Sequence, residues 1–388
     1  MNTGASRRTE RFDVIVLGAG PAGAAAAMTA ASSGLKVALV DKARFPRNKL
    51  CGGGITGRAL RHYQRIFGGT LPDVPLERRG DFSFHAFGKD LGASRNVPPL
   101  HLGMRYQLDD TLVRQAISAG AADFTGVTGT LDPTTPALDL PRHRLEAKIL
   151  IAADGVNSPT ARSLFGTAYD PSKIGFALEV ERPGVDPKRP LRIDFGAANW
   201  GYGWQFPKPE GTTIGVGGVL SRNADMKSAL KRYLRVLDVS ENLPVKGQFL
   251  PFGDFRKTPG KGRVLFAGDA AGLVDPITGE GIAHALDSGA LAAEAARTAL
   301  AKGNPDDALA KYMRALHPIH SDLRYARVLR NVMFREALRP AFIRSFRASR
   351  TLRGDYLRLM AGEVDYGPLM RKTAARLPQF AWRAIIGR

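Results

Sequence analysis

A glycine turn near the N-terminus, with the carboxylate that follows it, has the residue types and spacing of a nucleotide site. Gly18, Gly20 and Gly23 follow the apolar run 14–17, and Asp41 ends the next apolar run. Gly18 permits a tight turn, Gly20 lets a pyrophosphate approach the backbone, and Gly23 lets a helix pack closely on a sheet. The first amides of that helix then face phosphates, and Asp41 reaches a ribose hydroxyl pair. The pattern predicts dinucleotide binding.

Two later segments complement the first glycine turn. Residues 153–158, ADGVNS, place an Asp-Gly turn at the end of a buried strand. Residues 268–282, GDAAGLVDPITGEGI, place Gly-Asp at the end of another strand and close with a second glycine turn that opens a helix. Either dipeptide alone is a common turn. Three motifs in this order predict one site assembled from separated segments.

The elements that position these motifs follow from apolar periodicity. Buried strands are expected at 148–153 and 263–267, each leading into one of the turns. Residues 174–219 have the pattern of antiparallel strands joined by Gly, Pro and Asn turns, continuing to 250 with one helix near 226–237. Beyond residue 300 the pattern is mostly helical.

The predicted fold class is therefore α/β, with a Rossmann-like nucleotide domain, an inserted antiparallel β-sheet domain and a C-terminal helical region. The nucleotide domain is expected to comprise residues 1–75, 101–165 and 251–310. The substrate-binding β-rich domain is expected at 76–100 and 166–250. A basic helical region is expected at 311–388.

Composition limits the class of protein. A chain of 388 residues with 44% hydrophobic content can bury a large core in two or three domains. Its single cysteine, Cys51, excludes an internal disulfide framework and fits a reducing compartment, so we expect a cytoplasmic protein. His317 and His320 have helical spacing but no third ligand nearby, so no metal site is expected.

The formal net charge of +20 is concentrated near the C-terminus, where residues 312–388 contain sixteen Lys or Arg and five Asp or Glu. No nucleic-acid-binding motif accompanies this charge, so we expect no nucleic acid partner. An anionic membrane surface or a phosphate-bearing substrate explains it better, with the protein peripheral on the inner face of the membrane. The expected membrane contact is a basic amphipathic stretch with arginines at 324, 327, 330, 335, 339, 344, 347, 350, 353 and 358.

Longer motifs resemble one family. Residues 44–55 read RFPRNKLCGGGI, similar to a PRxKxCGGG loop, and residues 202–208 read YGWQFPK, matching a YxWxFPK motif. With the 268–282 segment and GEVDY at 362–366, the chain resembles the geranylgeranyl reductase family, within the glutathione-reductase-type FAD proteins of para-hydroxybenzoate hydroxylase topology. The Pro-rich link 129–145 departs from the family by abbreviating the strands before Asp154.

The resemblance implies an FAD cofactor and a set of site residues. Cys51, with Gly52 and Gly53, is implied at the reacting face, where the thiol orients substrate or relays a proton; a lone cysteine is otherwise a small apolar group. Arg105 matches a family arginine near the cofactor, and from sequence alone it is equally a surface cation. The implied cofactor-binding residues are Gly18, Gly20, Pro21, Ala22, Gly23, Asp41, Lys42, Arg47, Cys51, Gly52, Arg105, Val127, Asp154, Gly155, Gly268, Asp269, Gly279, Gly281 and Ile282.

The substrate side is expected on one strand. Tyr202, Trp204 and Phe206 alternate, face one way and suit a polyprenyl chain, although such a stripe is ordinarily core packing. Lys208 meets either a headgroup phosphate or solvent.

The implied activity is reduction of carbon–carbon double bonds in a prenyl lipid, with NAD(P)H or another reductant as electron donor. Three alternatives stay open. An aromatic hydroxylase on this fold commonly has His where this chain has Gly272, and a halogenase would have WxWxIP where this chain has YGWQFPK. A flavoprotein that modifies a partner polypeptide would use the basic C-terminal region for docking.

Overall fold

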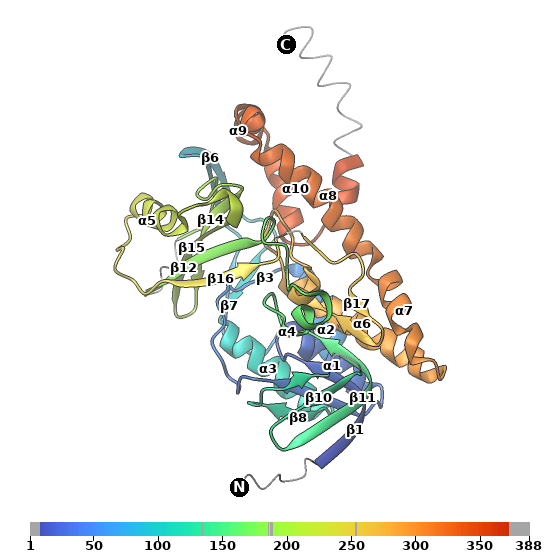
Figure 1. The fold of residues 1–388 in the computed structure, drawn as a ribbon. Helices are drawn as coiled ribbons and strands as arrows, with labels where there is room; N and C mark the ends of the chain where they lie inside the picture. The colour runs from blue at the N-terminus through green and yellow to red at the C-terminus, as the bar shows by residue number, and fades with distance from the viewer. Residues whose placement is uncertain (1–7, 133–134, 185, 187–188, 253, 372–388) are drawn as a thin grey trace.

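The computed structural model describes residues 8–132, 135–184, 186, 189–252 and 254–371. Figure 1 shows two β-sheet layers with helices packed around them and a C-terminal group of helices beside the second sheet. The part of the predicted basic region at 372–388 lies outside the described residues.

The nucleotide-binding half is built on a sheet with the strand order β17-β18-β11-β1-β2-β8, and β9 and β10 extend it beside β11. The central strands β1, β2 and β11 pair in parallel, and their consecutive apolar residues are buried on both faces of the sheet. The strands are β1 Arg8–Leu17, β2 Val37–Asp41, β8 Ala122–Thr125, β9 Thr130–Leu131, β10 Ala137–Asp139, β11 His143–Ala152, β17 Gly260–Lys261 and β18 Val264–Phe266.

Alanine-rich helices pack on this sheet. Helices α1 and α6 meet so closely that a Cβ at Gly289 would overlap the Ala22 carbonyl oxygen. Most alanines of α1 are buried, so the helix is packed on several sides. This packing fixes the position of the glycine turn that precedes it. The helices of this half are α1 Pro21–Ser32, α2 Gly57–Phe67, α3 Arg105–Ser118, α4 Pro159–Phe165, α6 Ile282–Ala301 and α7 Ala308–Ala315.

The second layer is a seven-stranded sheet of order β16-β12-β15-β14-β13-β5-β6, antiparallel except where β13 pairs in parallel with β5. One face packs on α5, Met226–Val236, and the other faces the cavity and the C-terminal helices. The strands are β5 Phe82–Ala86, β6 Lys89–Ser94, β12 Gly175–Pro183, β13 Leu191–Phe195, β14 Gly201–Lys208, β15 Gly211–Val219 and β16 Lys246–Leu250. A small sheet, β3 Gly54–Ile55, β7 Leu100–Gly103 and β4 Leu76–Arg79, lies between the two layers.

The C-terminal helices cover the aromatic part of this sheet. Phe346 and Tyr356 contact Phe84 and Phe195 edge to face, with ring centroids 5.4–5.8 Å apart. The helices are α8 His317–Phe334, α9 Arg339–Ala348 and α10 Arg350–Met360.

The α/β fold class expected from the sequence is confirmed. The element bounds differ in detail, because β11 begins at His143 rather than near 148. The Pro-rich link 129–145 contains the two short strands β9 and β10 and the start of the ten-residue strand β11. The expected domain boundaries stay a prediction.

Candidate active site

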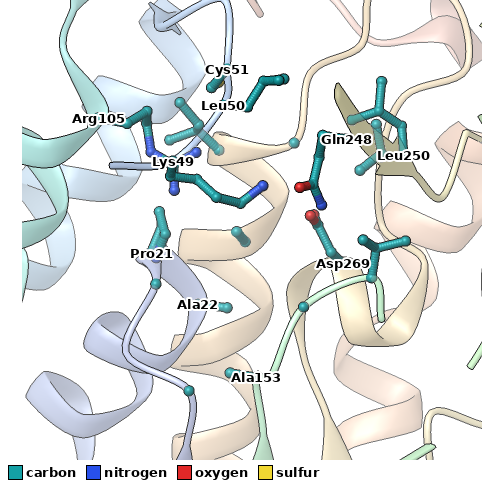
Figure 2. A pocket seen from close by; sticks show the side chains of 18 of the residues that line it. Pro21, Ala22, Lys49, Leu50, Cys51, Arg105, Ala153, Gln248, Leu250 and Asp269 are labelled. Atoms are coloured by element: carbon teal, nitrogen blue, oxygen red, sulfur yellow. The ribbon is translucent and has the colours of Figure 1, made fainter. Parts of the chain in front are cut away.

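A cavity of about 820 Å³ lies where the carboxyl ends of β1, β2 and β11 face the antiparallel sheet. One side, here called the cradle wall, is formed by residues 17–22, 153–157 and 279–282. The other side, the sheet wall, is formed by cavity-facing residues of β12, β14 and β16. Figure 2 shows Pro21, Ala22 and Ala153 on the first side, with Gln248 and Leu250 across from them.

The glycine turn of the cradle wall has no room for side chains. Gly18 has a φ of 98°, and a Cβ there would collide with Ala153 backbone atoms. A Cβ at Gly23 would overlap the Gly18 carbonyl oxygen. At Gly20 a Cβ would meet only Arg47 Nη2, at 3.6 Å, so this position is open toward the cavity. Helix α1 begins at Pro21 with no side-chain cap, which leaves its first amides available to an anion.

Asp41 stabilises the turn as well as lining the cavity. Its Oδ2 accepts a 2.7 Å hydrogen bond from the Ala19 amide, and its Oδ1 accepts a 2.8 Å bond from the Ala43 amide. Each carboxylate oxygen has a second lone pair for a ribose hydroxyl. A change at Asp41 therefore disturbs both the turn and any ligand.

Two arginines beside the turn share one buried carboxylate. Asp109 on α3 is fully buried and accepts bonds of 2.8 and 2.9 Å from Arg105. It also pairs with Arg47 at 3.1 Å. Burial opposes the charged guanidinium, but Asp109 and the Cys51 sulfur raise the pKa of Arg105, which stays charged. Arg105 is thus an interior cation, and sequence reasoning missed Asp109, which holds it.

The loop between β2 and β3 brings Lys49 and Cys51 to the cavity. The Cys51 sulfur accepts a 3.4 Å hydrogen bond from the Gly53 amide, so the thiol is folded back on its own glycine turn. Lys49 extends across the cavity from the side of Arg105 toward Gln248 and Asp269 (Figure 2). Burial lowers the pKa of Lys49, partly offset by Asp269. Sequence reasoning named neither Lys49 nor Gln248 as a site residue.

Lys208 lies elsewhere than the sequence predicts. Its side chain is 3% exposed, and Nζ donates to the Cys51 carbonyl at 3.2 Å and to Glu181 Oε1 at 3.3 Å. It is therefore shielded from bulk solvent, and its charge is paired with Glu181. The correction has a local cause, because the Cys51–Gly53 loop closes over this end of β14 and Glu181 supplies the counter-charge. Lys208 holds the Cys51–Gly53 loop in place.

Tyr202, Trp204 and Phe206 all line the cavity from β14. The Trp204 indole lies over Gly215 on β15, where a Cβ would overlap its ring. Its Nε1 is buried with no hydrogen-bond partner. The Phe206 ring packs against Gly52, where a Cβ would lie 3.0 Å away.

Glu179 on β12 is a cavity residue that sequence reasoning missed. It is 2% exposed and accepts a 3.2 Å hydrogen bond from the Cys51 amide. Burial raises its pKa to about 7, with Lys208 opposing the shift and Glu181 adding to it. The available signal is the acidic Glu179, which follows the apolar residues Phe176, Ala177 and Leu178 and continues the face of Ala177.

The turn before α6 is fixed from both sides. Asp275 accepts amide bonds from Ile277 and Thr278 at 2.7 and 2.9 Å. The Tyr366 hydroxyl of the GEVDY segment donates to Asp275 at 2.9 Å, and Tyr202 donates to the Thr278 carbonyl at 2.7 Å. The late motif therefore stabilises this cavity-lining turn.

The expected amides at the N-terminus of α6 are only partly available. Glu280 Oε1 accepts from the Ala283 amide at 2.9 Å, while Gly281 and Ile282 face the cavity. Asp154 also faces it, accepting from the Thr160 amide at 3.1 Å, and burial raises the Asp154 pKa.

The structure brings most of the sequence-predicted residues together. Those that line the cavity are Gly18, Gly20, Pro21, Ala22, Asp41, Lys42, Arg47, Cys51, Gly52, Gly53, Arg105, Val127, Asp154, Gly155, Tyr202, Trp204, Phe206, Asp269, Gly279, Gly281 and Ile282. Gly23, Gly268 and Lys208 lie behind this lining, Gly23 and Gly268 at close backbone packing. No cluster of three or more potential metal ligands occurs among the described residues.

These features fit a flavin dinucleotide. Arg47 Nη1 is buried without a partner beside the open Gly20 position, where a pyrophosphate would supply acceptors. The uncapped α1 terminus and the Asp41 lone pairs add donors and acceptors for the rest of the dinucleotide. Fold and site together define an FAD-dependent oxidoreductase, and residues 13–68 match the FAD dependent oxidoreductase family model.

Comparison with known proteins narrows the class. The chain is 32% identical to menaquinone reductase of Mycolicibacterium smegmatis, over 73% of this chain and 76% of that protein. It is 30% identical to geranylgeranyl diphosphate reductase of Rhodobacter capsulatus, over 76% and 78%. It is 31% identical to digeranylgeranylglycerophospholipid reductase of Methanosarcina mazei, over 76% and 77%. The chain belongs to the geranylgeranyl reductase family, and its cofactor is FAD.

Solved structures agree on the fold. A geranylgeranyl bacteriochlorophyll reductase-like protein from Thermoplasma acidophilum has a TM-score of 0.74 at 22% identity, covering 84% of this chain and 88% of its own. The flavin-dependent brominase Bmp2 has a TM-score of 0.69 at 19% identity, covering 91% and 94%. Because reductases and halogenases share this architecture, the fold alone does not select the reaction.

Proposed function

We propose that this protein reduces carbon–carbon double bonds of an isoprenoid chain of the geranylgeranyl type. The observation that carries the proposal is the continuity of one cavity from the cofactor cradle to an apolar wall. Beyond the three aromatic residues of β14, that wall includes Leu250, Phe252 and Met360. Apolar lining of this kind suits a flexible hydrocarbon, and it leaves few polar groups to recognise a compact aromatic acid.

Bound, reduced FAD supplies a hydride equivalent to the alkene. The chain's own residues bind, orient and exclude water. Arg47 and the amides of α1 hold the pyrophosphate, and Asp41 holds a ribose. Trp204 and Phe206 orient the hydrocarbon, and Cys51 with Gly52 and Gly53 forms the surface where cofactor and substrate meet.

One local feature disfavours the hydroxylase alternative. Gly272, where flavin hydroxylases commonly have histidine, has a φ of 81°, and a Cβ there would overlap the Asp254 carbonyl. A histidine at this position would require the backbone to move. The glycines at 215–217 form no second nucleotide cradle, since they accommodate Trp204 in β15. We infer that NAD(P)H or another reductant delivers electrons without a dedicated dinucleotide fold.

We also propose that the substrate is reached at an anionic membrane surface. None of the helices in the described part of the chain is long and apolar enough to cross a membrane. On α8 and the turn after it, Tyr325, Val328, Val332 and Leu338 are 39–52% exposed. Exposed arginines accompany these apolar residues at 324, 335 and 344. This α8–α9 surface has the composition of a peripheral membrane contact on the cytoplasmic side.

The arginine stretch predicted from sequence is only partly at this surface. Arg330 donates to the Phe252 carbonyl at 2.8 Å, and Arg353 donates to the Phe346 carbonyl at 2.7 Å. Arg339 lies over the Phe87 ring, 4.1 Å from its centroid. These three side chains hold the helices against the protein rather than facing outward.

The test is anaerobic reoxidation of chemically reduced enzyme by prenyl lipids with diphosphate, glycerophospholipid or quinone headgroups. We expect at least one to reoxidise the flavin, with Trp204→Ala raising the substrate concentration required about tenfold or more and Trp204→Phe much less. FAD affinity should change little in either variant. If no prenyl lipid reoxidises the enzyme, and air leads to oxygen insertion into an aromatic acid, the proposal fails. If neither occurs, modification of a partner polypeptide becomes the leading alternative.

A further inference from the structure

Glu179 occupies a position from which a carboxyl group can reach a ligand in the cavity. On β12 the cavity-facing residues are Ala177 and Glu179, while Leu178 and Val180 face α5. The neighbouring strand β15 places Gly215 opposite Glu179. Since Gly215 has no side chain, the Trp204 indole lies over it on the same face of the sheet.

The two oxygens of Glu179 have different surroundings. Oε1 accepts a 3.2 Å hydrogen bond from the Cys51 amide, which fixes the side chain beside the reactive loop. Oε2 is buried and has no hydrogen-bond partner. A buried carboxyl oxygen without a partner is costly unless it is protonated or meets a ligand. The structure therefore fixes one oxygen and leaves the other without a partner, on a side chain that lines the cavity.

Charged neighbours adjust the protonation of this carboxyl from three sides. Lys208 on β14 and Lys246 on β16 favour the carboxylate, and Glu181 on β12 opposes it. Lys208 is shared with Glu181 Oε1 and the Cys51 carbonyl, so its charge is not available to Glu179 alone. With burial as the largest cause, the pKa of Glu179 rises to about 7.

We propose that Glu179 is the proton donor for alkene reduction, an assignment that rests on the proposed function. One alkene carbon accepts a hydride, two electrons with a proton, from the reduced flavin. The O–H bond of Glu179 breaks and a new C–H bond forms at the other alkene carbon. The alkene is reduced, the flavin is oxidised, and the remaining carboxylate recovers its proton from water.

Two other proton-bearing groups in the cavity, Tyr202 and Cys51, are less suited to this step. The Tyr202 hydroxyl already donates to the Thr278 carbonyl, and burial raises the Tyr202 pKa. The Cys51 sulfur accepts from the Gly53 amide. Trp204 Nε1, the other polar atom of the sheet wall without a partner, is not an acid at accessible pH.

The first test is Glu179→Gln, which keeps the acceptor for the Cys51 amide but has no acidic proton. In anaerobic single turnover with geranylgeranyl diphosphate, reoxidation should slow about a hundredfold or more. Glu179→Asp should recover part of the rate, and Glu241→Gln, a partly exposed glutamate outside the cavity that pairs with Arg235, should equal the wild type. In the wild type the rate should fall as pH rises through about 7, and in Glu179→Gln it should not.

The second test needs no turnover. Infrared difference spectra of the protein without substrate should contain a protonated-carboxyl band that titrates near pH 7 and is absent in Glu179→Gln. Glu181→Gln should shift that midpoint downward, because it removes the like charge and frees Lys208.

The outcomes separate the two proposals. If the wild-type protein reduces no prenyl lipid, the proposed function is wrong. An active wild type with an equally active Glu179→Gln removes the proton-donor assignment and leaves the function standing. An active Glu179→Gln accompanied by an inactive Cys51→Ser would transfer the role to Cys51.

Discussion

The cradle wall presents mainly backbone to the cavity, whereas the sheet wall presents side chains brought together from distant strands. At Gly18, Gly20 and the start of α1, recognition depends on glycine conformation and exposed amides. At Glu179 and Trp204 it depends on neighbours across β15 and on the Cys51 loop. On this account the proposed cofactor contacts are encoded locally in the chain, while the proposed substrate contacts depend on tertiary packing.

The largest effect should come from breaking the cradle wall. Gly23→Ala places a Cβ on the Gly18 carbonyl oxygen, so the turn must open. We expect FAD affinity to fall about a hundredfold or more, equivalent to about 3 kcal/mol. Flavin content after purification and reconstitution measures it. Gly354→Ala in α10 is the control, since no atom lies within 4 Å of its Cβ, and it should keep FAD. A yellow, fully loaded Gly23→Ala protein would contradict this account of the turn.

On the sheet wall, the expected effect is a pH dependence of folding stability caused by Glu179. The Glu179 pKa is raised from 4.5 to about 7, so the folded state binds an extra proton between these values. Stability should therefore fall as pH rises from 4.5 to 7, by about 3 kcal/mol relative to Glu179→Gln. Denaturant unfolding of both proteins at several pH values tests this. Parallel pH curves would show that Glu179 ionises normally.

A smaller effect is expected at Asp41, where backbone and ligand roles coincide. Asp41→Ala removes acceptors from the Ala19 and Ala43 amides and from the ribose. FAD binding should weaken by about 1.5–3 kcal/mol through loss of charge-assisted hydrogen bonds. Titration calorimetry on apoprotein measures it, with Asp41→Asn expected to lose less. Unchanged affinity in Asp41→Ala would remove this residue from the cofactor site.

The smallest effect concerns the α8–α9 surface, which belongs to neither wall. Charge reversal of Arg335 or Arg344 should weaken binding to anionic vesicles by about 1 kcal/mol each, and added salt should do the same. Flavin content should not change. Co-sedimentation that is absent in the wild type, or insensitive to salt, would show that these exposed residues are only a solvated helical face.

The sequence predicts the cradle wall well because its signals are short. Gly18, Gly20 and Asp41 lie within one strand–turn–helix–strand unit, and the expected α/β architecture follows from it. The sheet wall is less readable. From sequence, Lys208 resembles an ordinary surface lysine. It is buried only because the Cys51 loop closes over it and Glu181 supplies the counter-charge.

Two residues whose partners are distant in the chain, Asp109 and Glu179, were not predicted from the sequence. Asp109 sits on α3 and holds Arg47 from a loop sixty residues earlier, a pairing that no spacing rule encodes. Glu179 lies 128 positions from Cys51 and meets it only through the packing of β12 against the loop. An acidic residue inside an apolar strand was the one signal that pointed to it.

Product mass tests the central claim most directly. Enzyme with chemically reduced FAD should be incubated with geranylgeranyl diphosphate in the absence of oxygen, and the lipid should be analysed by mass spectrometry. The account predicts an increase of about two mass units for each double bond saturated, with one hydrogen from the flavin and one exchangeable with solvent. An unchanged prenyl lipid, together with an oxygenated aromatic product once air is admitted, would contradict it.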